Sequence, residues 1–167
     1  MAHGPRYRVA RRRRREGKTD YRKRVKLLKS RTHRAVVRSS LRNLRVQLVE
    51  FDSKGDKIIA QAEGLELEKL GWKGSCSNTP AAYLTGYLAG KRAKSAGIEK
   101  AVLDIGLHTP TKGAKVFATL KGLLDSGIEI PHDDEIIPSD ERIKGGHIKE
   151  ELKNQFDSVK ASIEGAK

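Results

Sequence analysis

The feature that most constrains this chain is a dense run of positive charge near its N-terminus, RRRRREGKTDYRKRVKLLKSRTHR, which spans residues 11–34. Residues 1–45 contain 18 Lys and Arg but only Glu16 and Asp20 as acidic residues, a local net charge of +16. Since the whole chain carries +14, the other 122 residues sum to −2. The sequence therefore predicts a nearly neutral domain that carries a cationic arm, rather than a uniformly basic protein.

Several kinds of protein and site are disfavoured by the sequence. No apolar stretch approaches the 18 residues that indicate a membrane span, and charge stands where a signal peptide needs an apolar segment, so we expect a cytoplasmic protein. Cys76 is the single cysteine and has no Cys or His partners at zinc-ligand spacing, which predicts a buried or idle thiol. The five histidines are scattered, and neither a metal site nor a cofactor is predicted.

Three segments after the arm alternate apolar and polar residues as strands do: 34–38, 43–51 and 57–63. Short linkers with turn residues join them, so we predict an antiparallel three-stranded meander. The third segment is expected to turn three side chains to one face: Ile58, Ala60 and Ala62. The open face of the sheet is expected to gather polar side chains: Arg34, Arg38, Arg45, Gln47 and Lys57.

A helix is predicted over about residues 80–96, because Asn78 or Thr79 suits its N-cap and Pro80 suits its first turn. Its small residues Gly86 and Gly90 favour close packing on a sheet.

A buried strand over 101–105 and a second helix over about 113–126 are predicted to follow. The order strand, helix, strand, helix favours a parallel strand reached by a right-handed crossover. We therefore predict an α/β fold with a mixed sheet, in which the antiparallel three-stranded meander gains one parallel strand and packs with two helices.

The C-terminal part differs in composition. Residues 131–147 are acidic and indicate an irregular connection. A narrow helical stripe then predicts a helix that docks on the domain or on a neighbour; its members are Ile148, Leu152, Phe156, Val159 and Ile163. We divide the chain into a basic extended arm (1–33), an α/β core domain (34–130), an acidic connection (131–147) and a C-terminal amphipathic helix (148–167).

The segment GLHTPTKGAK, residues 106–115, lies between a predicted strand and helix, as a phosphate-binding loop does. Nucleotide hydrolysis is rejected, because Lys112 precedes Gly113 and no Ser or Thr is placed for magnesium. Backbone amides at a helix N-terminus, with Lys112 and Lys115 beside them, still favour a site for an RNA backbone phosphate slightly over a plain turn.

The acidic residues pose a second chemical alternative. Asp104 in a strand and Asp133, Asp134 and Glu135 in a loop would hold the metal pair of a nuclease if they converged. A carboxylate that satisfies a loop backbone and an acidic run at the solvated surface are the favoured interpretations, and we predict no catalytic residue.

The arm is interpreted as an element that binds a polyanion, with a localisation signal or a solvated tail as the alternative. Tyr7 and Tyr21 interrupt it, as side chains that stack on bases do. We expect the free arm to be disordered, because ordering costs about 1–2 kcal/mol per residue in backbone entropy. Folded RNA is favoured over lipid, since no basic amphipathic helix is present, and over DNA, since no helix-turn-helix or zinc finger is present. Basic residues also continue into the sheet at Arg34, Arg38, Arg42 and Arg45.

Four segments, in this order, resemble one family: GPRYRVARRRRREGKTDYRKRVKLLKS, GWKGSCSNTPAAYLTGYLAGKRA, AVLDIGLHTPTKGAKVF and GIEIPHDD. They are similar to the large-subunit ribosomal protein that binds 5S ribosomal RNA in the central protuberance, known as L-eighteen in bacteria and archaea and L-five in eukaryotes. The resemblance runs from about residue 4 to 148. The full arm and the lack of a long C-terminal extension resemble the archaeal form.

The resemblance implies a non-enzymatic component of the large ribosomal subunit. Its implied partners are 5S rRNA, 23S rRNA and neighbouring proteins of the central protuberance, with no membrane and no small-molecule substrate. Trp72 matches a family position, where core packing is favoured over an RNA contact. The expected RNA contacts, with Arg38 and Arg45 added from the sheet face, are Arg6, Arg8, Arg11, Arg12, Arg13, Arg14, Arg15, Tyr21, Arg22, Arg24, Lys26, Lys29, Arg34, Thr111, Lys112 and Lys115.

Three interpretations stand at this point. A protein that binds 5S rRNA explains the arm, the sheet face and the four segments. A metal-dependent nuclease explains only the acidic residues, and an unspecific nucleic-acid-binding tail explains only the charge.

Overall fold

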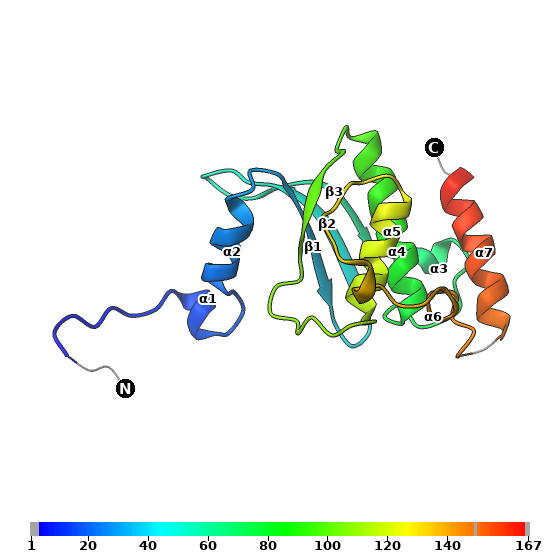
Figure 1. Ribbon diagram of the computed structural model, residues 1–167, viewed down its shortest axis with the longest axis horizontal. Helices are drawn as coiled ribbons and strands as arrows, with labels where there is room; N and C mark the ends of the chain where they lie inside the picture. Colours follow the sequence, from blue (N-terminus) through cyan, green and yellow to red (C-terminus); the bar gives the residue numbers. More distant parts are fainter. Residues whose placement is uncertain (1–3, 149, 166–167) are drawn as a thin grey trace.

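The computed structural model describes residues 4–148 and 150–165. Its four strands form one sheet in the order β3-β2-β1-β4. Their bounds are β1 His33–Ser39, β2 Leu44–Glu50, β3 Lys57–Glu63 and β4 Ala101–Asp104. The first three strands pair antiparallel, and β4 pairs parallel with β1 (Figure 1). The predicted α/β fold with a mixed sheet is confirmed.

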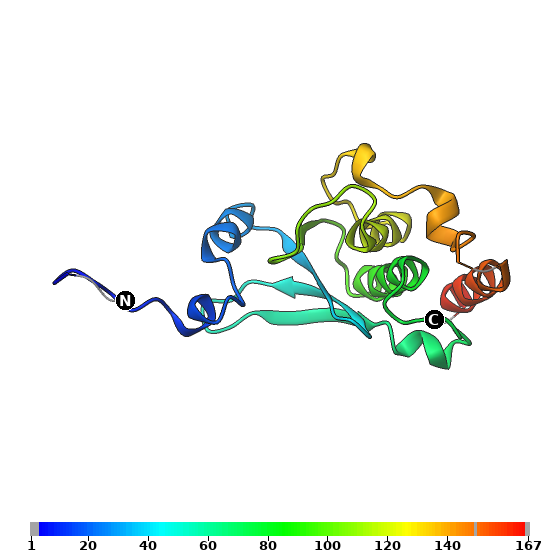
Figure 2. The same cartoon turned by 90° about the horizontal axis from the view of Figure 1, so that it is seen from below.

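Two long helices, α4 (Thr79–Ser95) and α5 (Lys115–Asp125), cover one face of the sheet (Figures 1 and 2). The helix α4 starts where the sequence predicts, because the Asn78 side chain accepts a hydrogen bond from the Ala81 amide at 2.9 Å and Pro80 stands in the first turn. It ends before Gly97, whose φ of +81° suits glycine.

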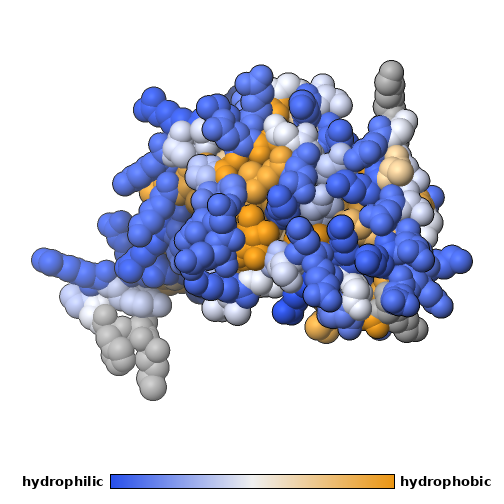
Figure 3. All heavy atoms as spheres, turned by 45° about the vertical axis from the view of Figure 1, so that its right-hand side comes forward, coloured by the Kyte–Doolittle hydropathy of each residue, from blue (hydrophilic) through white to orange (hydrophobic). Residues whose placement is uncertain are grey.

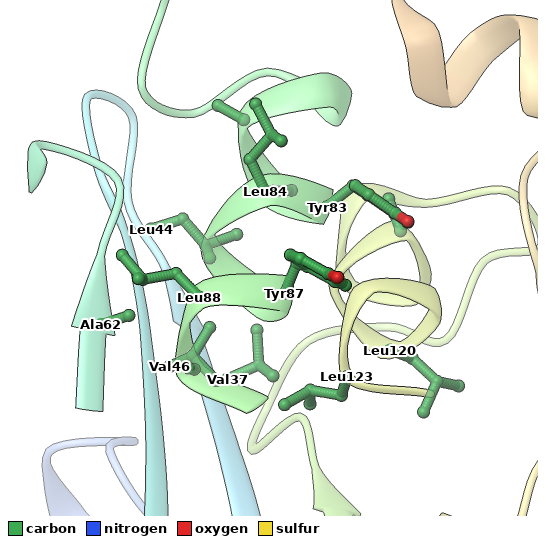
Figure 4. Close-up of a cluster of buried hydrophobic side chains, with 14 of the residues drawn as sticks. Val37, Leu44, Val46, Ala62, Tyr83, Leu84, Tyr87, Leu88, Leu120 and Leu123 are labelled. Carbon is green, nitrogen blue, oxygen red and sulfur yellow. The ribbon is translucent and has the colours of Figure 1, made fainter. Parts of the chain in front are cut away.

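The core lies between this sheet face and the two helices. Figure 4 shows sheet residues such as Val46 and Ala62 beside Leu88 of α4, while Tyr83 and Tyr87 of the same helix point toward α5. Apolar side chains at every second position of the strands are fully buried there. Trp72, which precedes α4, is 2% exposed and belongs to this core. The interpretation of Trp72 as a core residue is thus confirmed.

One predicted strand face is wrong in part. Ile58 was expected to point the same way as Ala60 and Ala62, but it is 49% exposed whereas both alanines are buried. The pairing between β2 and β3 shifts at Leu48/Val49, so that Val49 pairs with Ile58 and Ile59 is the extra residue. This β-bulge turns Ile58 to the opposite face.

The C-terminal helix α7 (Glu150–Gly165) packs on α4 of its own domain. The ring of Phe156 lies 5.3 Å from that of Tyr83, and the Tyr87 hydroxyl donates to Glu164 Oε1 at 2.9 Å. Four residues of the predicted stripe are buried, whereas Ile148 is 43% exposed and precedes the helix. The helix was predicted to dock on the domain or on a neighbour, and in the structure it docks on the domain.

Short helices occur where irregular chain was expected. The predicted acidic connection contains η1 (Asp134–Ile136) and α6 (Asp140–Lys144), and α3 (Glu66–Lys69) follows β3. In the arm, α1 (Arg12–Arg15) and α2 (Tyr21–Leu28) replace the expected disorder. The division of the chain into four functional regions stays a prediction. No helix of residues 4–148 and 150–165 is long and apolar enough to cross a membrane.

Candidate nucleic-acid interface

The basic arm forms a helical element beside the sheet rather than a loose tail. The helix α2 lies on the side of the sheet away from α4 and α5 (Figures 1 and 2). Asp20 caps it, and its side chain accepts from the amides of Arg22 at 2.9 Å and Lys23 at 3.2 Å. These backbone hydrogen bonds, that from Lys23 foremost, hold the pKa of the Asp20 carboxyl below its ordinary value.

The cations that precede α2 point into solvent. Arg11 to Arg15 are all exposed, and the guanidinium of Arg11 lies 5.1 Å from the centre of the Tyr21 ring. Glu16 is engaged inside the arm, 3.6 Å from Arg12 Nε and 3.0 Å from Lys18 Nζ. Both acidic residues of the arm therefore serve its own local structure and leave most of its positive charge unneutralised. Figure 3 shows the N-terminal side of the molecule, at the left, as mostly hydrophilic.

A chain of ion pairs joins α2 to the sheet. Arg24 Nη2 donates to both oxygens of Asp56 at 2.8 Å, and Arg34 Nη2 donates to Asp56 Oδ2 at 2.6 Å. Arg34 Nη1 reaches Asp104 Oδ2 at 3.0 Å, and Arg38 Nη2 reaches Asp104 Oδ1 at 3.1 Å. Guanidinium and carboxylate groups thus alternate from the arm across β1 to β4. Charge-assisted hydrogen bonds of this kind are among the strongest in proteins.

Asp56 is the carboxylate that joins the arm to the sheet, through Arg24 and Arg34. Burial raises the pKa of its carboxyl, but hydrogen bonds from Arg24 and Arg34 outweigh burial and hold the pKa below its ordinary value. Asp56 is therefore a carboxylate near neutral pH.

A cleft of about 840 Å³ opens between the arm and the sheet. Its cations come from both sides: Arg11, Arg13, Lys18, Lys23, Arg24 and Lys26 from the arm, and Arg38 from β1. Its apolar lining comes mainly from the end of β4 and the loop after it: Leu27, Leu103, Ile105 and Pro110. Cations attract phosphates, and apolar surfaces accept the faces of unpaired bases, so the cleft matches the chemistry of a nucleic acid.

Most of the predicted RNA contacts are accessible. The exposed ones are Arg6, Arg8, Arg11 to Arg15, Arg22, Lys26, Lys29, Arg38, Arg45, Thr111 and Lys112, whereas Tyr21, Arg24 and Lys115 are half-buried. Arg38 and Arg45 are cross-strand partners on the open sheet face, and Arg45 also pairs with Glu63 at 2.7 Å.

The predicted exposure of Arg34 is wrong. This residue was expected on the open face as an RNA contact, but it is 2% exposed and both terminal nitrogens of its guanidinium are bound to carboxylates. Arg34 therefore binds Asp56, the carboxylate that also binds Arg24 of the arm, and does not meet solvent.

The second predicted patch is not part of the cleft. Within the described residues, the loop after β4 lines the cleft with Gly106 and Pro110. Lys112 Nζ instead pairs with Glu135 Oε2 at 2.5 Å, and Lys115 Nζ donates to Ser77 Oγ at 2.9 Å. The amide of Gly113, which the turn was expected to offer to a phosphate, donates to the Ile136 carbonyl at 3.0 Å.

The carboxylates considered for a nuclease do not converge. Asp104 is held by Arg34 and Arg38, while the side chain of Asp133 accepts from the Glu135 amide at 3.2 Å. In the part of the chain that the structure describes, no group of three or more His, Cys, Asp or Glu residues is arranged to hold a metal ion.

Sequence reasoning found the cations of this interface but missed the helix that presents them and the carboxylate that docks it. The helix had a signal, since Asp20 is a good N-cap and Tyr21, Val25 and Leu28 recur at helical spacing. No sequence signal distinguishes Asp56, because it is one polar residue among several in a turn.

An α/β domain that holds a dense cationic arm beside an open cleft is built to bind a polyanion. The sequence matches the family model described as "Ribosomal large subunit proteins 60S L5, and 50S L18" over residues 5–100 and 93–133, and the chain belongs to this family. The resemblance found in the sequence is thereby confirmed. Its members bind 5S rRNA and have a structural role in translation, so the chain is a constituent of the large subunit of cytoplasmic ribosomes.

Proposed function

We propose that the arm and its cleft are the surface through which this chain holds 5S rRNA. The observation that carries the proposal is the cleft itself, in which cations from α1, α2 and β1 surround an apolar floor. Residues 5–33 of the arm lie within the matched residues, whereas α6 and α7 lie outside them.

The finer assignments rest on the membership of this family. We place the chain in the central protuberance, beside 23S rRNA and neighbouring proteins, in an archaeal-type subunit. Its role is structural and not enzymatic, which is supported by the engagement of Asp104 with arginines and of Asp133 with a backbone amide. The arginines of residues 6–15 that do not line the cleft extend past it and meet backbone phosphates beyond it, because all of them are exposed; they are Arg6, Arg8, Arg12, Arg14 and Arg15.

The proposal is tested by the affinity for 5S rRNA and for a folded RNA of similar length, measured over several salt concentrations with magnesium present. We expect a preference for 5S rRNA that persists as salt rises. A variant with Arg11–Arg15 changed to Gln should bind more weakly, with a salt slope shallower by about 4 if each arginine meets a phosphate. Its control loses the same charge outside the arm, at five exposed lysines changed to Gln: Lys69, Lys73, Lys94, Lys144 and Lys153.

Equal losses in the two five-residue variants would contradict the proposed surface, since net charge alone would then set the affinity. The same mixtures test the structural role. The RNA should stay intact over the incubation with magnesium, and cleavage that requires the protein would favour the nuclease.

A further inference from the structure

We propose that Asp56 is a positioning residue for RNA binding, which holds α2 against the sheet so that the cleft is formed before RNA arrives. This inference rests on the proposed function and adds an acidic residue to a surface otherwise built of cations. Asp56 belongs to the connection between β2 and β3 and would not contact the RNA phosphates itself.

Arg24 of α2 docks on a carboxylate that the sheet holds in place. Arg24 comes from the fourth position after the Asp20 cap and reaches a carboxylate 32 residues away in sequence. The same carboxylate is held from the sheet by Arg34, whose side chain is only 3% exposed and is itself bound to Asp104. Arg24 and Asp56 are 32% and 27% exposed, so the contact lies between the buried sheet and the open cleft.

The sign of the surrounding charge explains why a carboxylate is needed. The helix α2 and its C-cap residue carry five cations from Arg22 to Lys29 and no acidic residue, and the helix faces Arg34 and Arg38 of the sheet. Cations on two facing elements repel each other, and they do so more strongly where water is partly excluded. Asp56 lies between Arg24 and Arg34 and turns that repulsion into two attractions.

Docking of α2 lowers the cost of binding RNA. An arm that is ordered only in the complex loses its conformational freedom at that moment, whereas a docked arm has lost it on folding. The cleft also needs α2 in place, because seven of its lining residues come from 20–27 or from Asp56.

The alternative role of Asp56 predicts the opposite effect. If this carboxylate only opposed phosphate binding by its negative charge, its removal would raise the positive potential of the cleft and tighten the complex. If it positions α2, its removal weakens the complex although the cleft becomes more positive. The direction of the change in affinity therefore separates the two roles.

The test compares Asp56→Asn with Asp52→Asn in the full chain. Asp52 lies in the same connection and loses the same charge, and among the described residues its side chain accepts bonds only from its neighbours Ser53 and Lys54. We expect Asp56→Asn to raise the dissociation constant for 5S rRNA about tenfold and Asp52→Asn to change it less than twofold. Hydrogen exchange of the α2 amides in the free protein should quicken in Asp56→Asn alone.

Unchanged or tighter RNA binding by Asp56→Asn, or α2 exchange equal to that of the wild type, would overturn the inference. If Asp56→Asn fails to fold, Arg24→Lys replaces it, because this variant keeps the charge and leaves Arg34, Asp56 and Asp104 in place. Arg24→Lys should quicken α2 exchange and weaken binding several-fold, and unchanged exchange would again overturn the inference. Failure of the proposed function is distinguished by the Arg11–Arg15 variant, whose affinity would then match its lysine control whatever Asp56 does.

Discussion

Arg34 and Asp104 form a buried ion pair across the parallel strands β1 and β4, with Arg34 Nη1 3.0 Å from Asp104 Oδ2. Their side chains are only 3% and 8% exposed. The second carboxylate oxygen accepts from Arg38 and from the amide of Gly106, so the pair also fixes the turn that follows β4. The core of the sheet, the arm and the floor of the cleft therefore meet at one buried charge cluster.

Removal of one partner from this cluster should destabilise the fold. We expect Asp104→Asn to lower the free energy of unfolding by about 3 kcal/mol, because Arg34 would stay buried with one carboxylate fewer. Urea unfolding measures the change. The control is Glu129→Gln, whose partner Lys100 is an exposed residue and whose loss should leave stability unchanged. Equal losses of unfolding free energy in the two variants would show that burial of the Arg34–Asp104 pair does not determine its contribution to stability.

The crossing of α4 and α5 depends on two glycines. A Cβ at Gly86 would collide with the carbonyl oxygen of Thr119, and a Cβ at Gly122 with that of Tyr83. Alanine in an exposed helix is more stable than glycine by about 1 kcal/mol, yet we expect Gly86→Ala and Gly122→Ala to lose about 1–3 kcal/mol, because the helices must separate. Thermal unfolding measures this loss. Gly55→Ala, where the space around the new Cβ is open, serves as the control, and stabilisation by either helix variant would contradict the close packing.

The single thiol should react slowly. Burial, with a hydrogen bond and negative charge from Glu68, raises the pKa of Cys76 to about 11, from an ordinary value of 9.0. At pH 8 the thiolate fraction is then lower by about a hundredfold, and thiolate is the reactive form. Alkylation at pH 8 should be slow in the native protein and fast after unfolding in urea. Equal rates in both states would contradict the buried position.

The strands and long helices were predictable because their signals are local. The alternation in 43–51 and the Asn78 cap with Pro80 need no knowledge of distant residues, and both elements lie within two residues of their predicted bounds. The bulge at Leu48/Val49 was not predictable, since it depends on how two strands pair. The helix α6 also involves distant residues, since it packs on α4 and buries Ile143.

The site was predictable in charge but not in arrangement. Exposed cations such as Arg14 and Lys26 can be predicted from composition, because the arm contains only two acidic residues. The burial of Arg34 depends on Asp56 and Asp104, which are 22 and 70 residues away in sequence and reach it only through the sheet topology. A cationic residue at the start of a strand looks the same in sequence whether it meets RNA or a buried carboxylate.

Docking of α2 should depend on pH only in acid. The pKa of Asp56 lies below its ordinary value of 3.8, so the carboxylate that binds Arg24 is charged throughout the neutral range. A group with a lowered pKa contributes its full stabilisation above the ordinary value and loses it as the pH falls through the lowered one. The α2 amide signals in NMR spectra should therefore be constant from pH 8 to about 5 and should shift only below about pH 4.

The Asp20 carboxylate would lose its N-cap hydrogen bonds to α2 in the same acidic range, because its pKa is also lowered. Protonation of Asp20 therefore has to be separated from protonation of Asp56. Asp56→Asn separates them, since it should free α2 at pH 7 while the Asp20 carboxylate still accepts from the amides of Arg22 and Lys23. The signals of residues 24–28 should then shift at neutral pH, and those of Arg22 and Lys23 should shift only in acid. A transition of the wild-type α2 signals between pH 5 and 7 would show that a histidine, and not Asp56, controls the docking of the arm.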